Sequence, residues 1–156
     1  MKPGISFRAA LEAAVKIEEN GAAFYEEAAR QSADPSAMEA FRKLAVLERE
    51  HRDFFLGLAA AEGSKPRDGS LPAELTLLAD RSVFDLGAGA AGLLNSRETG
   101  PQAVKIAIGL EKESIVFYAG LKNAMRSRTA AAKLDGIIAE ELRHISVLRG
   151  LMRSAI

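Results

Sequence analysis

The fold of this chain is decided by two stretches that repeat each other, AVKIEENGAAFY at residues 14–25 and AIGLEKESIVFY at residues 107–118. Apolar residues in both stretches recur at alternating steps of three and four, which is the spacing of an amphipathic helix rather than of a strand. Each stretch is followed by a second helical segment that contains the motif E-x-x-H. A shift of 93 residues, from 14 to 107, superposes the two halves without a gap.

Four helical segments separated by turn signals predict an all-α protein. The first helix ends near Gln31, and Asp34 with Pro35 has the chemistry of a cap and first turn for the second helix. Pro101 opens the third helix in the same way. Two helical hairpins joined by one long connection form a four-helix bundle of the one-crossover type. The predicted single domain, residues 1–156, therefore divides into a hairpin at 6–61, a crossover at 62–100 and a hairpin at 101–153.

The crossover differs in composition from the hairpins, because glycine, serine and proline are concentrated in it. Within it, residues 72–80 have the pattern of a short helix that begins with a proline. Residues 86–94 are rich in small residues and are expected to pack in the core or at an interface. The many small residues of the crossover also favour a homo-oligomer, most simply a homodimer.

Composition narrows the possible functions of the chain. The 21 Lys and Arg residues balance the 21 Asp and Glu residues, so no net charge favours binding to nucleic acid or to an anionic membrane. There is no cysteine, which excludes disulfides, thiolate catalysis and Cys-ligated metal centres within these residues. A metal would need oxygen and imidazole ligands. No apolar run is long enough for a signal peptide or a membrane span, so we expect a cytoplasmic protein.

Glutamates on successive helices are spaced so that they meet in the middle of the bundle. Glu18 and Glu48 are 30 residues apart around a turn near Ala33, so the chain runs about 22 Å along one helix and about 22 Å back. The corresponding residues of the second half have the same spacing. Each histidine follows a glutamate by three residues and therefore shares its helix face. The predicted metal ligands are Glu18, Glu48, His51, Glu111, Glu141 and His144.

Two observations favour a metal site over a chance pattern. Glutamate makes up roughly a tenth of the chain, so the probability that both histidines follow a glutamate by three residues is about 0.01. Four buried carboxylates also need neutralisation, which two divalent cations provide. A metal-free network of protonated glutamates and histidines is the alternative. The glutamates that lie off the inward-facing stripes are expected to form solvated helix faces: Glu19, Glu26, Glu27, Glu50, Glu113 and Glu140.

The motifs at Ala14–Tyr25, Glu48–His51, Ala107–Tyr118 and Glu141–His144 together resemble the ferritin-like domain of rubrerythrins. The resemblance covers the four main helices and leaves the crossover unmatched. It implies a ferritin-like fold and a di-iron site in which some carboxylates bridge the two irons and others bind only one. The residues alone leave open which glutamates bridge.

Two departures from rubrerythrins shape the expected chemistry. Rubrerythrins usually add a cysteine-ligated rubredoxin module, which these residues lack, so electrons would come from another protein such as a rubredoxin-like protein or a flavoprotein. Rubrerythrins also tend to place an extra glutamate ligand where this chain has Ser114, the repeat mate of Gly21. Tyr25 and Tyr118 follow Glu18 and Glu111 by seven residues, and their hydroxyls are expected to hydrogen-bond the ligating carboxylates.

The resemblance implies a di-iron oxidoreductase that reduces peroxide or dioxygen and acts in oxidative stress. Carboxylate and imidazole ligands suit iron, with manganese or zinc as possible substitutes. Two alternatives stay open. One is a ferritin-like protein that oxidises and hands on ferrous iron. The other is a structural bundle in which a metal supports the fold only.

Overall fold

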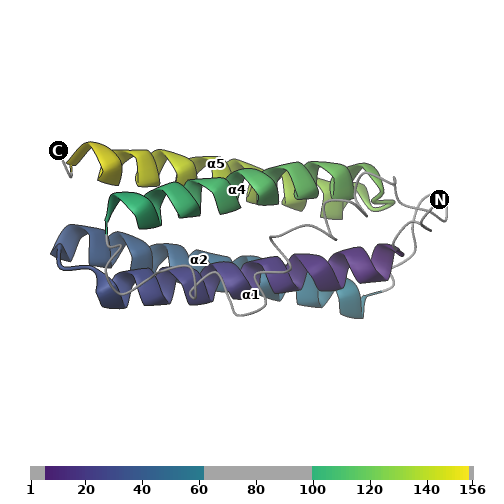
Figure 1. The fold of residues 1–156 in the computed structure, drawn as a ribbon. Coiled ribbons are helices and arrows are strands. Elements are labelled where there is room, and N and C mark those ends of the chain that lie inside the picture. Colours follow the sequence, from purple (N-terminus) through teal and green to yellow (C-terminus); the bar gives the residue numbers. More distant parts are fainter. Residues whose placement is uncertain (1–5, 62–99, 155–156) are drawn as a thin grey trace, which may run out of the picture.

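The computed structural model describes residues 6–61 and 100–154, and these residues form two antiparallel helical hairpins (Figure 1). The first hairpin packs α1 against α2, and the second packs α4 against α5. The predicted all-α bundle of two hairpins is confirmed. The short helix and the small-residue segment expected in the crossover lie outside the described residues. The helices are α1 (Phe7–Gln31), α2 (Pro35–Ala60), α4 (Pro101–Asn123) and α5 (Arg128–Ser154).

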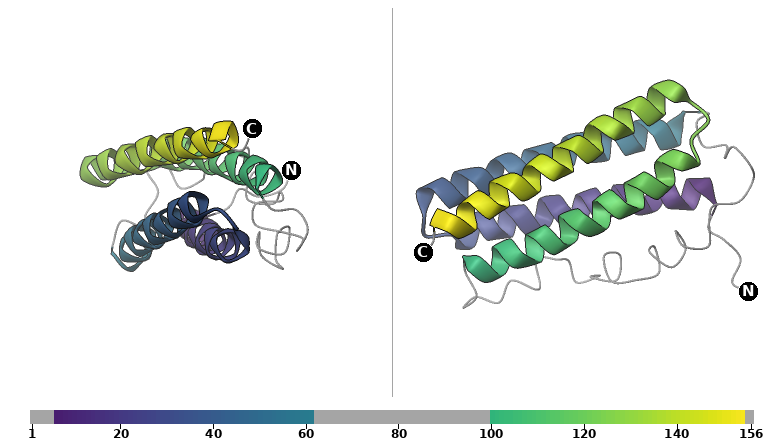
Figure 2. Two further views of the ribbon diagram at one scale, coloured as in Figure 1. Left: turned by 90° about the vertical axis from the view of Figure 1, so that its left-hand side faces the viewer. Right: turned by 90° about the horizontal axis from the view of Figure 1, so that it is seen from above.

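The two hairpins lie on top of each other as two layers (Figure 2). Across the layers the backbone of α1 approaches that of α4 and the backbone of α2 approaches that of α5, whereas the diagonal pairs of helices meet only through long side chains such as Phe55 and Tyr118. The contacts between layers are much sparser than those within a hairpin. Large side chains therefore fill the space between the layers, and this space is where the inward-facing stripes of all four helices meet.

Local capping explains where α1 and α2 begin. The hydroxyl of Ser6 accepts a hydrogen bond from the backbone N–H of Ala9 at 3.1 Å. The carboxylate of Asp34 accepts from the N–H groups of Ser36 and Ala37, at 3.3 and 3.1 Å, as its position before Pro35 predicts. These bonds satisfy N–H groups that have no partner within the helix.

The core between the layers has an apolar cluster towards each end of the bundle. One cluster contains Phe55, Phe117 and Leu134, and the other contains Phe24, Phe41 and Leu148. Burying a side chain of this size stabilises the fold by about 1.5–3 kcal/mol. The four phenylalanines that the sequence assigns to packing are all buried: Phe24, Phe41, Phe55 and Phe117.

Among the residues of 6–61 and 100–154, no helix combines the length and apolar composition that a membrane crossing requires.

Candidate metal centre

All four helices contribute to one buried group of polar side chains in the middle of the bundle. Glu18 comes from α1, Glu48 and His51 from α2, Glu111 from α4, and Glu141 and His144 from α5. Each of these residues is at most 4% exposed. The six residues that the sequence predicts as ligands are therefore brought together, and we refer to them below as the cluster.

The cluster divides into two overlapping groups of four. In each group, one ligand-type atom from every residue lies within 4.8 Å of the others. Glu48 and Glu141 belong to both groups, whereas the other four residues belong to one group each. The first group adds Glu18 and His51, and the second adds Glu111 and His144. This arrangement is consistent with a dinuclear metal site in which Glu48 and Glu141 are common to both positions, and the sequence leaves open which glutamates are shared.

Each histidine reaches across from its own hairpin to the other one. The Nδ1 atom of His51 lies 3.1 Å from an oxygen of Glu141 and 3.6 Å from one of Glu18. The Nδ1 atom of His144 lies 3.2 Å from Glu48 and 3.3 Å from Glu111. The two rings stack with centroids 5.8 Å apart. Both Nδ1 atoms thus face the carboxylates, as two imidazoles that ligate neighbouring ions would.

The two tyrosines hold the glutamates of the opposite layer. The hydroxyl of Tyr25 on α1 donates a hydrogen bond to Glu111 on α4, and the hydroxyl of Tyr118 on α4 donates one to Glu18 on α1. Each tyrosine therefore hydrogen-bonds the glutamate of the other hairpin rather than the one on its own helix. The exchange ties the two layers together at the level of the cluster.

Burial and neighbouring carboxylates keep the tyrosine hydroxyls protonated. Burial, together with the charges of Glu111 and Glu48, raises the pKa of Tyr25 well above its usual value. Burial and the nearby Glu18 raise the pKa of Tyr118 in the same direction. Both hydroxyls consequently remain hydrogen-bond donors at any physiological pH.

The histidines are strongly basic when no metal is bound. Burial opposes a charge on each ring, but the close carboxylates outweigh it and raise the pKa of His51 to about 11 and that of His144 to about 12. Burial also opposes ionisation of Glu141, yet the two adjacent histidines hold its pKa at about 2. In the metal-free protein the imidazolium protons therefore supply the positive charge that the cluster needs.

The remaining glutamates prefer to be protonated in the absence of metal. Burial raises the pKa of Glu111 to about 8, and the charge of Glu141 adds to the effect. Burial and neighbouring carboxylates raise the pKa of Glu48 well above its usual value. Burial also raises the pKa of Glu18. Ionising all four carboxylates together thus requires cations to replace the bound protons.

The chemistry of the donor atoms fits a pair of divalent metal ions. Five buried atoms of the cluster have no hydrogen-bond partner among the described residues: His144 Nε2, Glu18 Oε2, Glu48 Oε1, Glu141 Oε2 and His144 Nδ1. The last two lie 2.8 Å apart but are not aligned for a hydrogen bond. Unpaired buried acceptors are costly unless something binds them. Two divalent cations balance four carboxylates and two neutral imidazoles in formal charge, and they would bind all of these atoms except His144 Nε2.

Gly21 makes room for one of the shared carboxylates. A Cβ atom at this position would lie 2.5 Å from Oε2 of Glu48, which is closer than such atoms approach. At the repeat-related position, the hydroxyl of Ser114 donates to the carbonyl oxygen of Leu110 at 3.0 Å. The lack of a side chain at Gly21 therefore leaves room for the Glu48 carboxylate, whereas the hydroxyl of Ser114 is bonded to its own helix.

One expectation about the surface glutamates is wrong. Glu140 was expected to belong to a solvated helix face, yet its carboxylate lies 2.7 Å from Nε2 of His51. Its side chain is 38% exposed, so it is only partly solvated. Glu140 is one residue from the inward stripe of α5, and helix periodicity alone does not reveal that the outer edge of a ring on α2 extends towards it.

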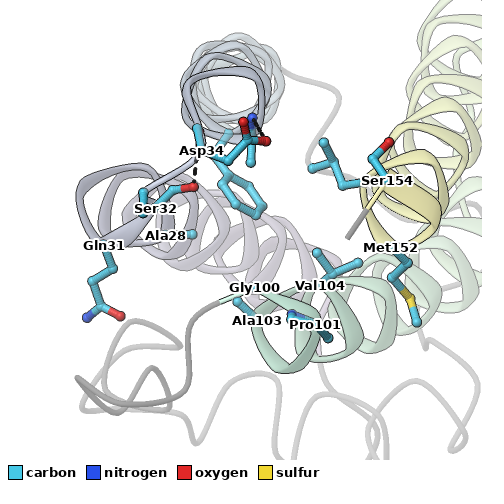
Figure 3. A pocket seen from close by; sticks show the side chains of 14 residues that line it. Ala28, Gln31, Ser32, Asp34, Gly100, Pro101, Ala103, Val104, Met152 and Ser154 are labelled. Carbon is cyan, nitrogen blue, oxygen red and sulfur yellow. Dashed lines mark hydrogen bonds between the residues drawn. The ribbon is translucent and has the colours of Figure 1, made fainter. Parts of the chain in front are cut away.

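A separate cavity of about 260 Å³ lies at the end of the bundle, beside the turn between α1 and α2 (Figure 3). Its walls include Phe41, Val104 and Met152, and Asp34 stands at its edge with its capping hydrogen bonds. No residue of the cluster lines it. The cavity is thus distinct from the metal centre.

Two antiparallel hairpins around a buried set of four glutamates and two histidines define a helical-bundle carboxylate protein with a site suited to two metal ions. Comparison with protein families agrees: the rubrerythrin family model matches residues 9–152. This chain belongs to the rubrerythrin family.

Comparison with solved structures supports the same fold. The crystal structure of a candidate ferritin-like diiron-carboxylate protein from Thermotoga maritima has a TM-score of 0.78 and 24% sequence identity to this chain, and the match covers 100% of both chains. The fold is therefore ferritin-like. No match was found among curated proteins.

Proposed function

We propose that this chain is a di-iron oxidoreductase that reduces peroxide or dioxygen with electrons from an external donor protein. The observation that carries the proposal is the pair of overlapping groups that share Glu48 and Glu141. Membership of the rubrerythrin family and the description of the Thermotoga maritima protein support it. Iron suits a donor set of carboxylates and imidazoles without thiolate, and manganese or zinc can occupy the same ligands.

The residues of the cluster have separate tasks in this proposal. Glu48 and Glu141 would hold both ions, while the other four ligands would hold one ion each. When bound, a pair of ferrous ions supplies two electrons, which with two protons convert hydrogen peroxide to two water molecules. Tyr25 and Tyr118 keep the carboxylates of Glu111 and Glu18 in place by donating hydrogen bonds to them from their hydroxyl groups. The apolar clusters on either side keep bulk water out of the site.

The proposed donor of electrons is a second protein, since these 156 residues contain no cysteine for a rubredoxin-type centre. A rubredoxin-like protein or a flavoprotein would have the right chemistry. A purified donor of either kind can be mixed with the protein and peroxide to test this proposal. Oxidation of the donor is followed by the absorbance of the donor's own redox centre. Failure of both to transfer electrons to the oxidised protein would contradict it.

Rapid mixing of the iron-loaded protein with peroxide tests the reaction. Protein loaded anaerobically with ferrous iron should oxidise two irons per chain faster than free ferrous ion does. Oxidation no faster than that of free iron would contradict the proposal. Glu39→Gln, which changes an exposed carboxylate of α2 that is paired with Lys43, is the matched control. Uptake far beyond two irons per chain would instead support the iron-handling alternative.

We also propose that the chain forms a homodimer. Large apolar side chains on α2 and α5 are 44–55% exposed, which favours a protein contact that involves these two helices. Sedimentation at micromolar concentration tests the assembly, and a monomer alone would contradict it. The side chains are Val46, Leu56, Leu142 and Val147.

A further inference from the structure

The two edges of the His51 ring face different carboxylates. Its Nδ1 atom faces the cluster, 3.1 Å from Glu141. Its Nε2 atom faces outward and lies 2.7 Å from Oε2 of Glu140, which is not a member of the cluster. The other oxygen of Glu140 lies 3.6 Å from the guanidinium group of Arg143. Glu140 is thus held between an exposed cation and the outer edge of a buried ring.

The ring of His144 has no equivalent support. Its Nδ1 atom faces the cluster, but its Nε2 atom is buried and has no hydrogen-bond partner among the described residues. The 93-residue repeat places Leu47 at the position that corresponds to Glu140. Leu47, Glu140 and His144 all line one groove between α2 and α5. One half of the cluster therefore has a carboxylate behind its histidine, and the other half has the apolar Leu47 at the repeat-related position.

This difference matters for a histidine that binds a metal through Nδ1. Such a ring is neutral, so its single proton is on Nε2 and can be donated to Glu140. A carboxylate that accepts this proton fixes the tautomer and the orientation of the ring and increases the basicity of the ligating nitrogen. Because the Glu140 side chain is 38% exposed, its charge costs far less desolvation than a charge in the cluster would.

We propose that Glu140 is a positioning residue, which makes the His51 half of the centre bind a divalent cation more tightly than the His144 half. The inference rests on the proposed metal centre and adds an order to it: the position formed by Glu18, Glu48, His51 and Glu141 fills first. The position formed with Glu111 and His144 fills second. A resting protein with limited metal would then hold one ion in a defined place.

Calorimetric titration of the metal-free protein with Co²⁺, together with visible absorption spectra, tests the proposal. The parent protein should show two classes of site. Glu140→Ala should weaken the tight class about 10–100-fold, and leave the weak class nearly unchanged. Glu140→Gln keeps an oxygen that can accept the Nε2 proton, so it should restore part of the affinity. Glu39→Ala removes a carboxylate from the same groove without a histidine contact and should leave both classes unchanged.

The converse substitution tests the same idea without removing anything from the tight site. Leu47→Glu gives His144 the repeat-related carboxylate and should strengthen the weak class selectively. Circular dichroism checks that each variant is folded, and Glu140→Gln and Leu47→Glu keep the test valid if Glu140→Ala unfolds. Equal weakening of both classes, or unchanged affinities in Glu140→Ala, would overturn this proposal alone. A parent protein that binds no Co²⁺ would overturn the proposed metal centre as well.

Discussion

In the hairpin of α1 and α2, the residue before the E-x-x-H motif is Leu47, whereas in the hairpin of α4 and α5 it is Glu140. The same two hairpins place Gly21 and Ser114 at matching positions, one beneath a shared carboxylate and the other bonded to its own helix. The six ligand-type residues and the two tyrosines are nonetheless identical in type between the halves.

Comparison of the two hairpins distinguishes the ligands that a dinuclear site requires from the surrounding groups that change the strength of each ligand. A pair of adjacent cations requires the same donor atoms from both halves, so the donors match. The groups behind the donors control the orientation and basicity of each ligand, and these groups differ. The centre is therefore symmetric in its ligands and asymmetric in its surroundings.

Removing a shared carboxylate should have the largest effect. Glu141→Ala takes a ligand from both positions, so it should weaken binding of both ions by at least about a hundredfold, more than the loss of a group behind a ligand costs. Glu18→Ala takes a ligand from one position and should leave binding of one ion. Calorimetric stoichiometry measures the difference, and identical behaviour of the two variants would show that Glu141 is not shared.

Lower pH should weaken metal binding at both the His51 and the His144 positions. At pH 7, His51 and His144 carry protons in the metal-free protein because their pKa values are about 11 and 12. Binding of two metal ions displaces both of these protons as well as those held by the buried glutamates, so the overall apparent affinity for the pair should rise by at least about a hundredfold per pH unit. Titrations in buffers of different ionisation enthalpy count the released protons. Release of fewer than two would contradict the assigned ligand states.

The stability of the metal-free protein should fall as the pH rises. The folded-state pKa values of His51, His144 and Glu111 are raised, so their contribution is complete below the unfolded values and is lost towards about 11, 12 and 8. The lowered pKa of Glu141 acts only below about pH 4.5. Denaturation midpoints with a chelator present should therefore be lower at pH 8.5 than at pH 5.5. The opposite trend would contradict the protonated state of the cluster.

The glycine beneath Glu48 offers a selective way to disturb one shared carboxylate. Gly21→Ala should displace the end of the Glu48 side chain and weaken metal binding about tenfold, an effect comparable to loss of a supporting group. The fold should tolerate the change, because only a flexible carboxylate must move. Gly109→Ala is the matched control, since nothing lies within 4 Å of its added Cβ atom, and it should stabilise the helix by about 0.5–1 kcal/mol. Unchanged metal affinity in Gly21→Ala would contradict the role of this glycine.

The tyrosines should give the smallest effects and nearly equal ones. Tyr25→Phe and Tyr118→Phe each remove one buried hydrogen bond to a glutamate of the other hairpin, so each should lower the free energy of unfolding by about 1–2 kcal/mol. Chemical denaturation measures both. A large difference between the two variants would show that the asymmetry extends to the tyrosines.

The features that occur in both hairpins can be predicted well from the sequence, because each motif is found twice, once in each half. The end of α1 and the start of α2 follow from Asp34 and Pro35, and the meeting of Glu18 with Glu48 follows from helix rise and hairpin length. Helix periodicity predicts which side chains face the core, but it does not predict whether such a side chain contacts its own hairpin or the other one. It therefore leaves open the crossed pairing of the tyrosines and gives the wrong environment for Glu140.

Anomalous scattering from crystals of protein produced in iron-supplemented medium tests the central claim most directly. Two iron peaks about 3.5–4 Å apart, both in contact with Glu48 and Glu141 and each in contact with one histidine, are the result expected. Iron peaks outside this cluster, or a single ion that touches only one histidine at full iron loading, would contradict the assignment.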